Sequence, residues 1–145
     1  MITSSNQFWC FYINVEEAKK FDAHKVGKWM YFFNDEEFAS KICSLAVENN
    51  IVAEAKHSTN SPNGSGVCCF YLNCDDDFTH KKIISFFLDN NLIRRTKTGK
   101  LYNISFKLDD QTRAGQYGDD FKSEIKLSNY IDLETGEFIK EIADS

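Results

Sequence analysis

The chain has 145 residues, a length that is typical of one domain with a sizeable hydrophobic core, so we predict a single domain over residues 1–145. Its formal net charge of -5 excludes a nonspecific nucleic-acid coat, which needs a basic surface, but still allows a local basic pocket for one phosphate or a short single strand. Aromatic residues make up 14% of the chain and include thirteen phenylalanines, which indicates that much of this aromatic mass is core.

Five cysteines occur without a Cys-x-x-Cys pair, and no histidine stands at zinc-ligand spacing from them. This pattern favours buried free thiols in a reducing compartment over disulfides or a metal site, and we expect no cofactor. The N-terminus has no basic stretch followed by an apolar one, and no run reaches membrane-spanning length. We therefore expect a cytoplasmic protein that does not bind a membrane.

The first predicted strand covers residues 7–15, after a polar start at residues 1–6 that we expect to be frayed. This strand is apolar on both faces, which indicates a central or covered position. Residues 16–25 are charged and fit either a short helical turn or a loop. The second predicted strand covers residues 27–33.

A helix is predicted after the second strand, because Asn34 offers an N-cap oxygen and Glu37 follows at the spacing of a capping box. Apolar residues then recur at helical spacing, so one helix face is expected to pack inward. Two asparagines at residues 49–50 mark the end of this helix.

Side chains of the third predicted strand, residues 51–59, alternate between two faces. One face is polar and carries Glu54, Lys56 and Ser58, which indicates contact with solvent or a ligand. The other face carries alanines and His57, so a helix can approach it closely, and we expect His57 to be packed.

A loop is predicted at residues 60–66, which hold the only proline and two glycines, and it leads to a fourth strand at residues 67–73. An acidic stretch at residues 75–77 then caps a second helix, which ends at the asparagines of residues 90–91. His80 lies in the first turn of that helix, where we expect a surface position.

The rest of the chain predicts two hairpins, formed by residues 92–96 with 101–108 and by residues 129–133 with 137–142. Between the hairpins, residues 109–120 read as a polar loop and residues 121–128 as either a strand or a helical turn. All the elements together predict an α+β fold, a curved and mostly antiparallel sheet of about seven or eight strands with two or three helices on its convex face. The concave face would then be free for a ligand.

Three stretches of the sequence together resemble a known family. They are Gly27-Lys28-Trp29-Met30-Tyr31-Phe32-Phe33, Ala55-Lys56-His57-Ser58-Thr59, and Phe106-Lys107-Leu108-Asp109 followed by Thr112-Arg113-Ala114-Gly115. In this order and spacing they resemble the basophilic-leukaemia-expressed protein family, whose fold is like that of the cap-binding translation initiation factor 4E. The resemblance covers roughly residues 27–118.

The resemblance implies a strongly curved antiparallel sheet with helices on its convex side, and a phosphate-bearing ligand or RNA. Bacterial members of the family are labelled as phosphothreonine lyase domain proteins, and lyases of that kind use a lysine as base and a histidine as acid. Lys56 matches the lysine. Met30 stands near the expected position of the histidine, and its side chain cannot donate a proton.

Converging cations make short, strong bonds to a phosphate dianion, so the cations at the motif positions are our first candidates for a phosphate pocket. These residues are Lys28, Lys56, Lys107 and Arg113. Ser58 shares the polar strand face with Lys56 and joins them as a ligand-binding candidate. Arg95 could extend the pocket to a second phosphate, although a solvated hairpin tip is the alternative for this residue.

Trp9, Trp29 and Tyr31 either fill the core or stack on a base, and the many neighbouring phenylalanines favour the core. Strand alternation places Trp29 opposite Lys28. We therefore predict that Lys28 and Met30 face the pocket and that Trp29 is in the core.

These observations support three hypotheses about function. The first is a non-enzymatic binder of a phosphate-bearing ligand, such as a nucleotide, a signalling nucleotide or a short RNA. The second is a lyase or another phosphate-handling enzyme with Lys56 as its catalytic base, which requires a proton donor such as His24 or Tyr31 nearby. The third is a module that binds a protein partner, which the aromatic excess and the acidic surface permit.

Overall fold

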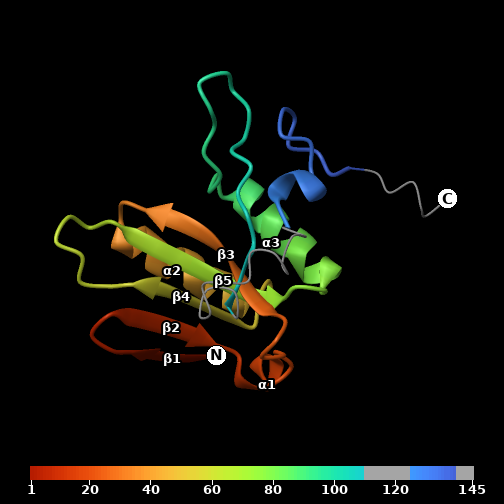
Figure 1. Ribbon diagram of the computed structural model, residues 1–145. Helices are drawn as coiled ribbons and strands as arrows, with labels where there is room; N and C mark the ends of the chain where they lie inside the picture. The colour runs from red at the N-terminus through yellow and green to blue at the C-terminus, as the bar shows by residue number, and fades with distance from the viewer. Residues whose placement is uncertain (110–124, 140–145) are drawn as a thin grey trace.

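Six strands form one antiparallel sheet in the structure, a computed structural model that describes residues 1–109 and 125–139 (Figure 1). The order across the sheet is β1-β2-β4-β5-β3-β6. The strands are β1 (Ile2–Ser5), β2 (Trp9–Ile13), β3 (Val26–Phe33), β4 (Glu54–Ser58), β5 (Gly66–Asn73) and β6 (Lys107–Leu108). The described helices are α1 (Val15–Ala18), α2 (Glu36–Glu48), α3 (Asp77–Asp89) and the 3-10 helix η1 (Leu127–Asn129).

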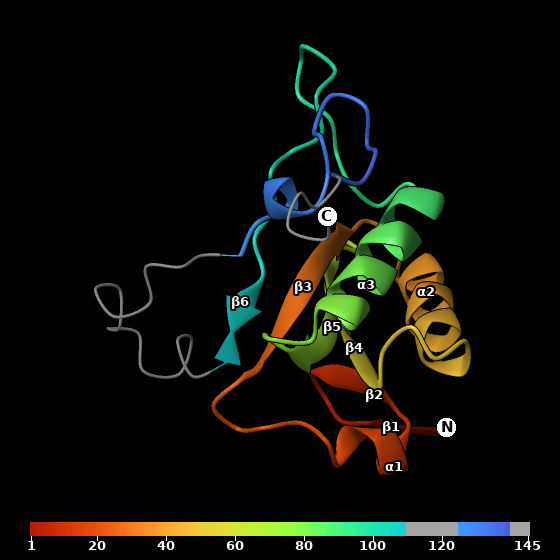
Figure 2. The ribbon, with the colours of Figure 1, turned by 90° about the vertical axis from the view of Figure 1, so that its right-hand side faces the viewer.

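The α+β class and the antiparallel, curved sheet are confirmed, but the described sheet has six strands rather than seven or eight. Figure 2 shows α2 and α3 on the same face of the sheet. We call this face the helix face. Helix α2 packs across β2, β3, β4 and β5, whereas α3 packs on β5. None of the described helices is both long and apolar enough to cross a membrane.

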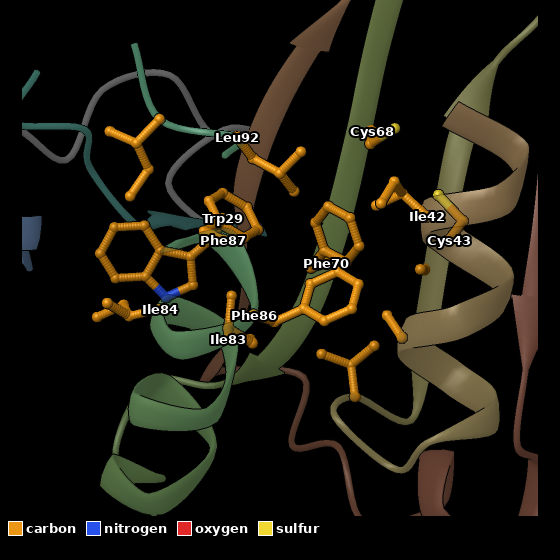
Figure 3. Close-up of a cluster of buried hydrophobic side chains, with 14 of the residues drawn as sticks. Trp29, Ile42, Cys43, Cys68, Phe70, Ile83, Ile84, Phe86, Phe87 and Leu92 are labelled. Carbon is orange, nitrogen blue, oxygen red and sulfur yellow. The ribbon is translucent and has the colours of Figure 1, made fainter. Parts of the chain in front are cut away.

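The core lies between the helix face and the two long helices. Figure 3 shows the ring of Phe70, from β5, between the side chains of α2 and those of α3. Trp29 is also buried in this layer, as strand alternation predicted. All five cysteines are free thiols, and Cys43, Cys68 and Cys69 are buried.

Helix α2 begins one residue later than the sequence predicted. Its N-cap is Asp35, not Asn34, and the Asp35 carboxylate accepts hydrogen bonds from the backbone N–H groups of Glu37 and Phe38. Asp35 has the extended backbone (φ -141, ψ 107) that turns an N-cap side chain back onto the first helical turn. At the other end Asn50 adopts a left-handed conformation (φ 59), which ends the helix as predicted.

His80 is fully buried, so its predicted surface position is wrong. The ring accepts a hydrogen bond from Trp29 Nε1 at its Nδ1 atom (3.0 Å), and its Nε2 lies 2.9 Å from the carbonyl oxygen of Cys74. Because Nδ1 accepts, the proton of the neutral ring is on Nε2, which donates to that carbonyl. Helical periodicity does not predict this burial, because it depends on the contact between the first turn of α3 and the indole of Trp29 on a distant strand.

Two regions differ from the predicted strands. Residues 1–6 are not frayed, because Ile2–Ser5 pairs with β2 as the outermost strand of the sheet. As a result, β2 is next to the edge rather than central. The two predicted hairpins form as irregular turns, each with one isolated bridge, Arg95–Leu101 and Ile131–Phe138, rather than as regular strands. Backbone hydrogen bonds from Tyr102 N to Arg94 O and from Ile139 N to Tyr130 O also cross them. Residues 104–106 bond to residues 125–127, through Phe106 N to Ile125 O and Leu127 N to Ile104 O.

Gly27 allows β6 to lie against β3. An added Cβ atom at this position would come within 2.5 Å of the backbone oxygen of Lys107 and would also overlap the ring of Phe106. The backbone oxygen belongs to the paired strand and cannot rotate away. Glycine at position 27 therefore sets the distance between the long strand and the short edge strand that carries Lys107.

Candidate functional site

Lys28 and Lys56 project from the same face of the sheet, the one opposite the helix face. Directly opposed residues of neighbouring strands share a face, and β5 links the two lysines. Lys28 is opposite Tyr71, and Lys56 is opposite Cys69 on the same strand. We call this surface the lysine face and define it by Trp9, Phe11, Lys28, Met30, Glu54, Lys56, Cys69, Tyr71 and Lys107.

The two lysines are separated by one strand and offset by two residues along the sheet. With strands about 4.8 Å apart and about 3.4 Å per residue, their Cα atoms are about 12 Å apart. Lysine side chains are long enough to reach toward a common ligand over that distance. The geometry therefore allows one extended anionic ligand to contact both residues.

Lys28 forms an ion pair with Asp109. Its Nζ lies 2.9 Å from Asp109 Oδ1, and the two side chains are only 14% and 25% exposed. Lys107 is directly opposite Lys28 on β6, and its side chain is exposed. Lys28 and Lys107 are thus neighbouring cations at this edge of the sheet. The carboxylate of Asp109 already forms an ion pair with Lys28.

Lys56 lies among aromatic rings. Its Nζ is 3.9 Å from the centroid of the Trp9 ring, 5.7 Å from that of Phe11 and 5.8 Å from that of Tyr71. A cation within about 6 Å of a ring centroid is attracted to the electron-rich face of the ring. The ammonium group of Lys56 is therefore held over Trp9 without a carboxylate partner among these contacts.

Burial controls the protonation of the polar groups beside Lys56. It raises the pKa of the Cys69 thiol to about 11 and raises the pKa of the Tyr71 hydroxyl well above its usual range. Both groups are therefore neutral at pH 7. Burial also raises the pKa of the Glu54 carboxyl, while the nearby charge of Lys56 opposes that change.

Two candidates from the sequence, Ser58 and Arg95, make local hydrogen bonds to the backbone. Ser58 Oγ accepts a hydrogen bond from the backbone N–H of Val67 (3.0 Å), so the hydroxyl joins β4 to β5. Arg95 donates from Nη1 to the carbonyl oxygen of Gly99 (2.8 Å), within a turn that extends away from the sheet (Figure 1). Arg113 lies outside the described residues.

The aromatic rings around Lys56 do not include a histidine. His57 is buried on the helix face, as predicted, with its Nε2 3.1 Å from the hydroxyl of Tyr12. His80, in the first turn of α3, is buried against Trp29. His24 and Tyr31, the proton donors considered for a lyase, both line a cavity of about 1020 Å³ at the edge of β3, and that cavity includes neither Lys28 nor Lys56.

The aromatic part of the lysine face is what sequence reasoning missed. The sequence favoured a core position for Trp9, but the residue is half-buried on the lysine face, where its ring contacts Lys56. Strand alternation alone cannot find this contact, because it depends on the register of β2 against β4, which places Phe11 opposite Lys56. Among the described residues, no group of three or more potential metal ligands gathers at this face or elsewhere.

A scan of the chain against protein-family models and a search of curated proteins both find no match. The resemblance to the basophilic-leukaemia-expressed protein family therefore stays a prediction.

Proposed function

We propose that this protein binds a phosphate-bearing ligand with an aromatic base, a nucleotide or the end of a short RNA, on the lysine face and without catalysis. The observation that carries the proposal is the shared face of Lys28 and Lys56, with Trp9 in contact with the second lysine. The proposal takes this face to be the concave side of the sheet, with the helices on the convex side.

Phosphate would bind at the Lys28 end of the face. Lys28 and Lys107 are directly opposed, and two ammonium groups can each donate a charge-assisted hydrogen bond to one phosphate. The ammonium group of Lys28 donates a hydrogen bond to the carboxylate of Asp109, so a phosphate that binds Lys28 must displace this carboxylate. A dianion carries more charge than a carboxylate and has three acceptor oxygens, which favours this exchange when Lys107 contributes as well.

The base would bind at the Lys56 end of the face. Trp9 and Phe11 offer aromatic surfaces, and stacking of a base on such a ring contributes roughly 1–3 kcal/mol in single-strand binders. Lys56 now covers the Trp9 ring, so stacking requires its ammonium group to move aside. The displaced ammonium group would then be free to contact the phosphate that follows the base.

The net charge of the chain limits how strongly the affinity for such a ligand can depend on salt concentration. With a net charge of -5, long-range attraction of a polyanion is absent, and only local cations contribute. A ligand that contacts one or two phosphates should lose affinity with a log–log salt slope of about -0.7 to -1.4. A much steeper slope would indicate a different and more extended surface.

Titration calorimetry with ATP, GTP and a five-nucleotide single-stranded RNA tests this proposal. Lys56→Met and Lys28→Met remove one charge each and should weaken binding by about tenfold, which equals about 1.4 kcal/mol. Lys41→Met is the matched control, because Lys41 is an exposed lysine on α2, on the other side of the sheet. Absence of heat for every phosphate ligand, or equal losses in all three variants, would contradict the proposal.

A further inference from the structure

Within the described residues, one edge of β3 is unpaired over most of its length. The other edge pairs with β5 from Val26 to Phe33, whereas β6 covers only Gly27 and Lys28. No other strand of residues 1–109 and 125–139 pairs with β3 beyond Lys28. Across the gap, Ile104 and Phe106 make backbone hydrogen bonds to residues 125–127, and Tyr102 N donates to Arg94 O.

The main chain of Met30 and Phe32 points into this gap. In an antiparallel pair, the N–H and C=O groups of one residue both point to the same neighbouring strand, and successive residues alternate. Cys74 N donates to Lys25 O, which places the odd-numbered residues of β3 in hydrogen-bonded pairs with β5. The N–H and C=O groups of Met30 and Phe32 must therefore point away from β5, toward the open edge.

The gap beside this edge is the cavity of about 1020 Å³, which we call the edge slot. Met30, Tyr31 and Phe32 line one side of it, and residues 102–108 line the other. The Phe32 side chain is 58% exposed and that of Tyr102 is 50% exposed, so both walls offer apolar surface to a ligand. Paired spacing of main-chain groups between apolar walls is what an added β-strand recognises.

The described lining of the edge slot carries positive charge, on a protein whose net charge is negative. Arg94 and Lys107 line it, and none of its described lining residues is an aspartate or a glutamate. Arg94 is exposed and close enough to Tyr31 for its charge to oppose the burial that raises the pKa of the Tyr31 hydroxyl. These cations favour an acidic ligand, and they disfavour a second copy of the same edge because like charges would meet.

We propose that the edge slot binds an extended acidic peptide of a partner protein as an added strand beside β3. The peptide exchanges main-chain hydrogen bonds with Met30 and Phe32, and its acidic side chains meet Arg94 and Lys107. Its alternate side chains contact Met30 and Phe32 on the lysine face and Tyr31 on the helix face. This interaction uses a different surface from the proposed nucleotide site and does not depend on it, apart from Met30 and Lys107, which line both.

Fluorescence anisotropy with two labelled synthetic hexapeptides, one alternating valine with glutamate and one alternating valine with lysine, tests the proposal. The acidic peptide should bind at least about tenfold more tightly than the basic one. Phe32→Pro removes the N–H group that faces the slot and leaves the pairing with β5, so it should weaken binding of the acidic peptide by about tenfold or more. Phe32→Ala keeps that N–H group and should weaken binding by no more than about threefold.

A charge variant keeps the test decisive if Phe32→Pro does not fold. Arg94→Glu should reverse the preference so that the basic peptide binds more tightly, while Lys97→Glu, an equal change at an exposed residue outside the slot, should leave the preference unchanged. Equal binding of both peptides to every variant overturns the proposal. A dimer in sedimentation that Phe32→Pro dissociates, with neither peptide bound, also overturns it and assigns the edge to a second copy of the chain.

Discussion

The helix face and the lysine face belong to the same strands but are built from different chemistry. On the helix face, Trp29 and Phe70 are buried beneath two helices, and the polar atoms there have partners within the chain, such as His80 for the Trp29 indole. On the lysine face, charged residues stand among aromatic rings. Lys28 pairs with Asp109, and Lys56 lies over Trp9.

This difference separates stability from binding. Apolar side chains of the helix face are removed from water and closely packed, and this burial is the main source of folding free energy. The lysine face holds two ammonium groups with partners that a stronger anion or a flat base could replace. We therefore expect substitutions on the helix face to change unfolding, and substitutions on the lysine face to change ligand binding.

The largest effect is expected from Phe70→Ala. The Phe70 ring is fully buried, with its centroid 5.3 Å from that of Phe87, and its loss leaves a cavity that costs about 3–5 kcal/mol of unfolding free energy. The matched change on the lysine face is Phe11→Ala, a half-buried ring that should cost only about 1 kcal/mol. Urea unfolding of both variants measures this. Equal losses would show that the two faces contribute alike to stability.

Gly27→Ala should disrupt the junction between β3 and β6. The new methyl group overlaps the Phe106 ring and the Lys107 backbone, and overpacking of this kind costs about 1–3 kcal/mol. The edge strand should move away from β3 and carry Lys107 with it. Thermal unfolding measures the cost, and NMR shifts of the Lys107 amide report the movement. An unchanged amide shift would mean that Gly27 does not determine the position of β6.

His80 should make stability depend on pH, because burial lowers its pKa below the usual value near 6.5, with the charges of Asp77, Asp76 and Asp75 opposing. Between the folded and unfolded pKa values, the unfolded state binds more protons than the folded state. This part of the stability is therefore complete above about pH 6.5 and falls as pH drops, by up to about 1.4 kcal/mol per unit.

Urea unfolding at pH 7.5, 6.5 and 5.5 measures this slope, and His80→Gln should remove the His80 part of it. The carboxyl of Glu54, whose pKa burial raises, contributes with the opposite sign. That contribution is present in both proteins and cancels in the difference between them. Identical slopes for the two proteins would show that His80 does not titrate on unfolding.

The smallest effect is expected from Asp109→Asn, which rests on the proposed phosphate site. Removing the carboxylate that occupies Lys28 should raise the affinity for pyrophosphate by about two- to tenfold, the equivalent of a contact worth about 0.4–1.4 kcal/mol. Asp75→Asn breaks the exposed Lys25–Asp75 pair, which is a matched control away from the site, and should leave affinity unchanged. A lower affinity for Asp109→Asn would show that Asp109 supports the anion site instead of competing for it.

Much of the local structure follows from the sequence. Strand alternation separated Lys28 from Trp29 and put Lys56 on the face opposite His57, as the register confirms. Both long helices end at the asparagines that mark their stops. These features depend on the period of a strand or helix and on residues only a few positions apart, so the chain carries them locally.

The tertiary structure alone decided which residues meet across the chain. Pairing of β2 with β4 puts Trp9 beside Lys56, and the approach of β6 to Gly27 puts Asp109 beside Lys28. The same packing brings His80, in the first turn of α3, to the indole of Trp29, and among the described residues it leaves the edge of β3 unpaired past Lys28. The register of the strands and the pairing of their edges depend on hydrogen bonds and packing between segments far apart in the chain. The local hydrophobic period of a strand or helix therefore does not predict them.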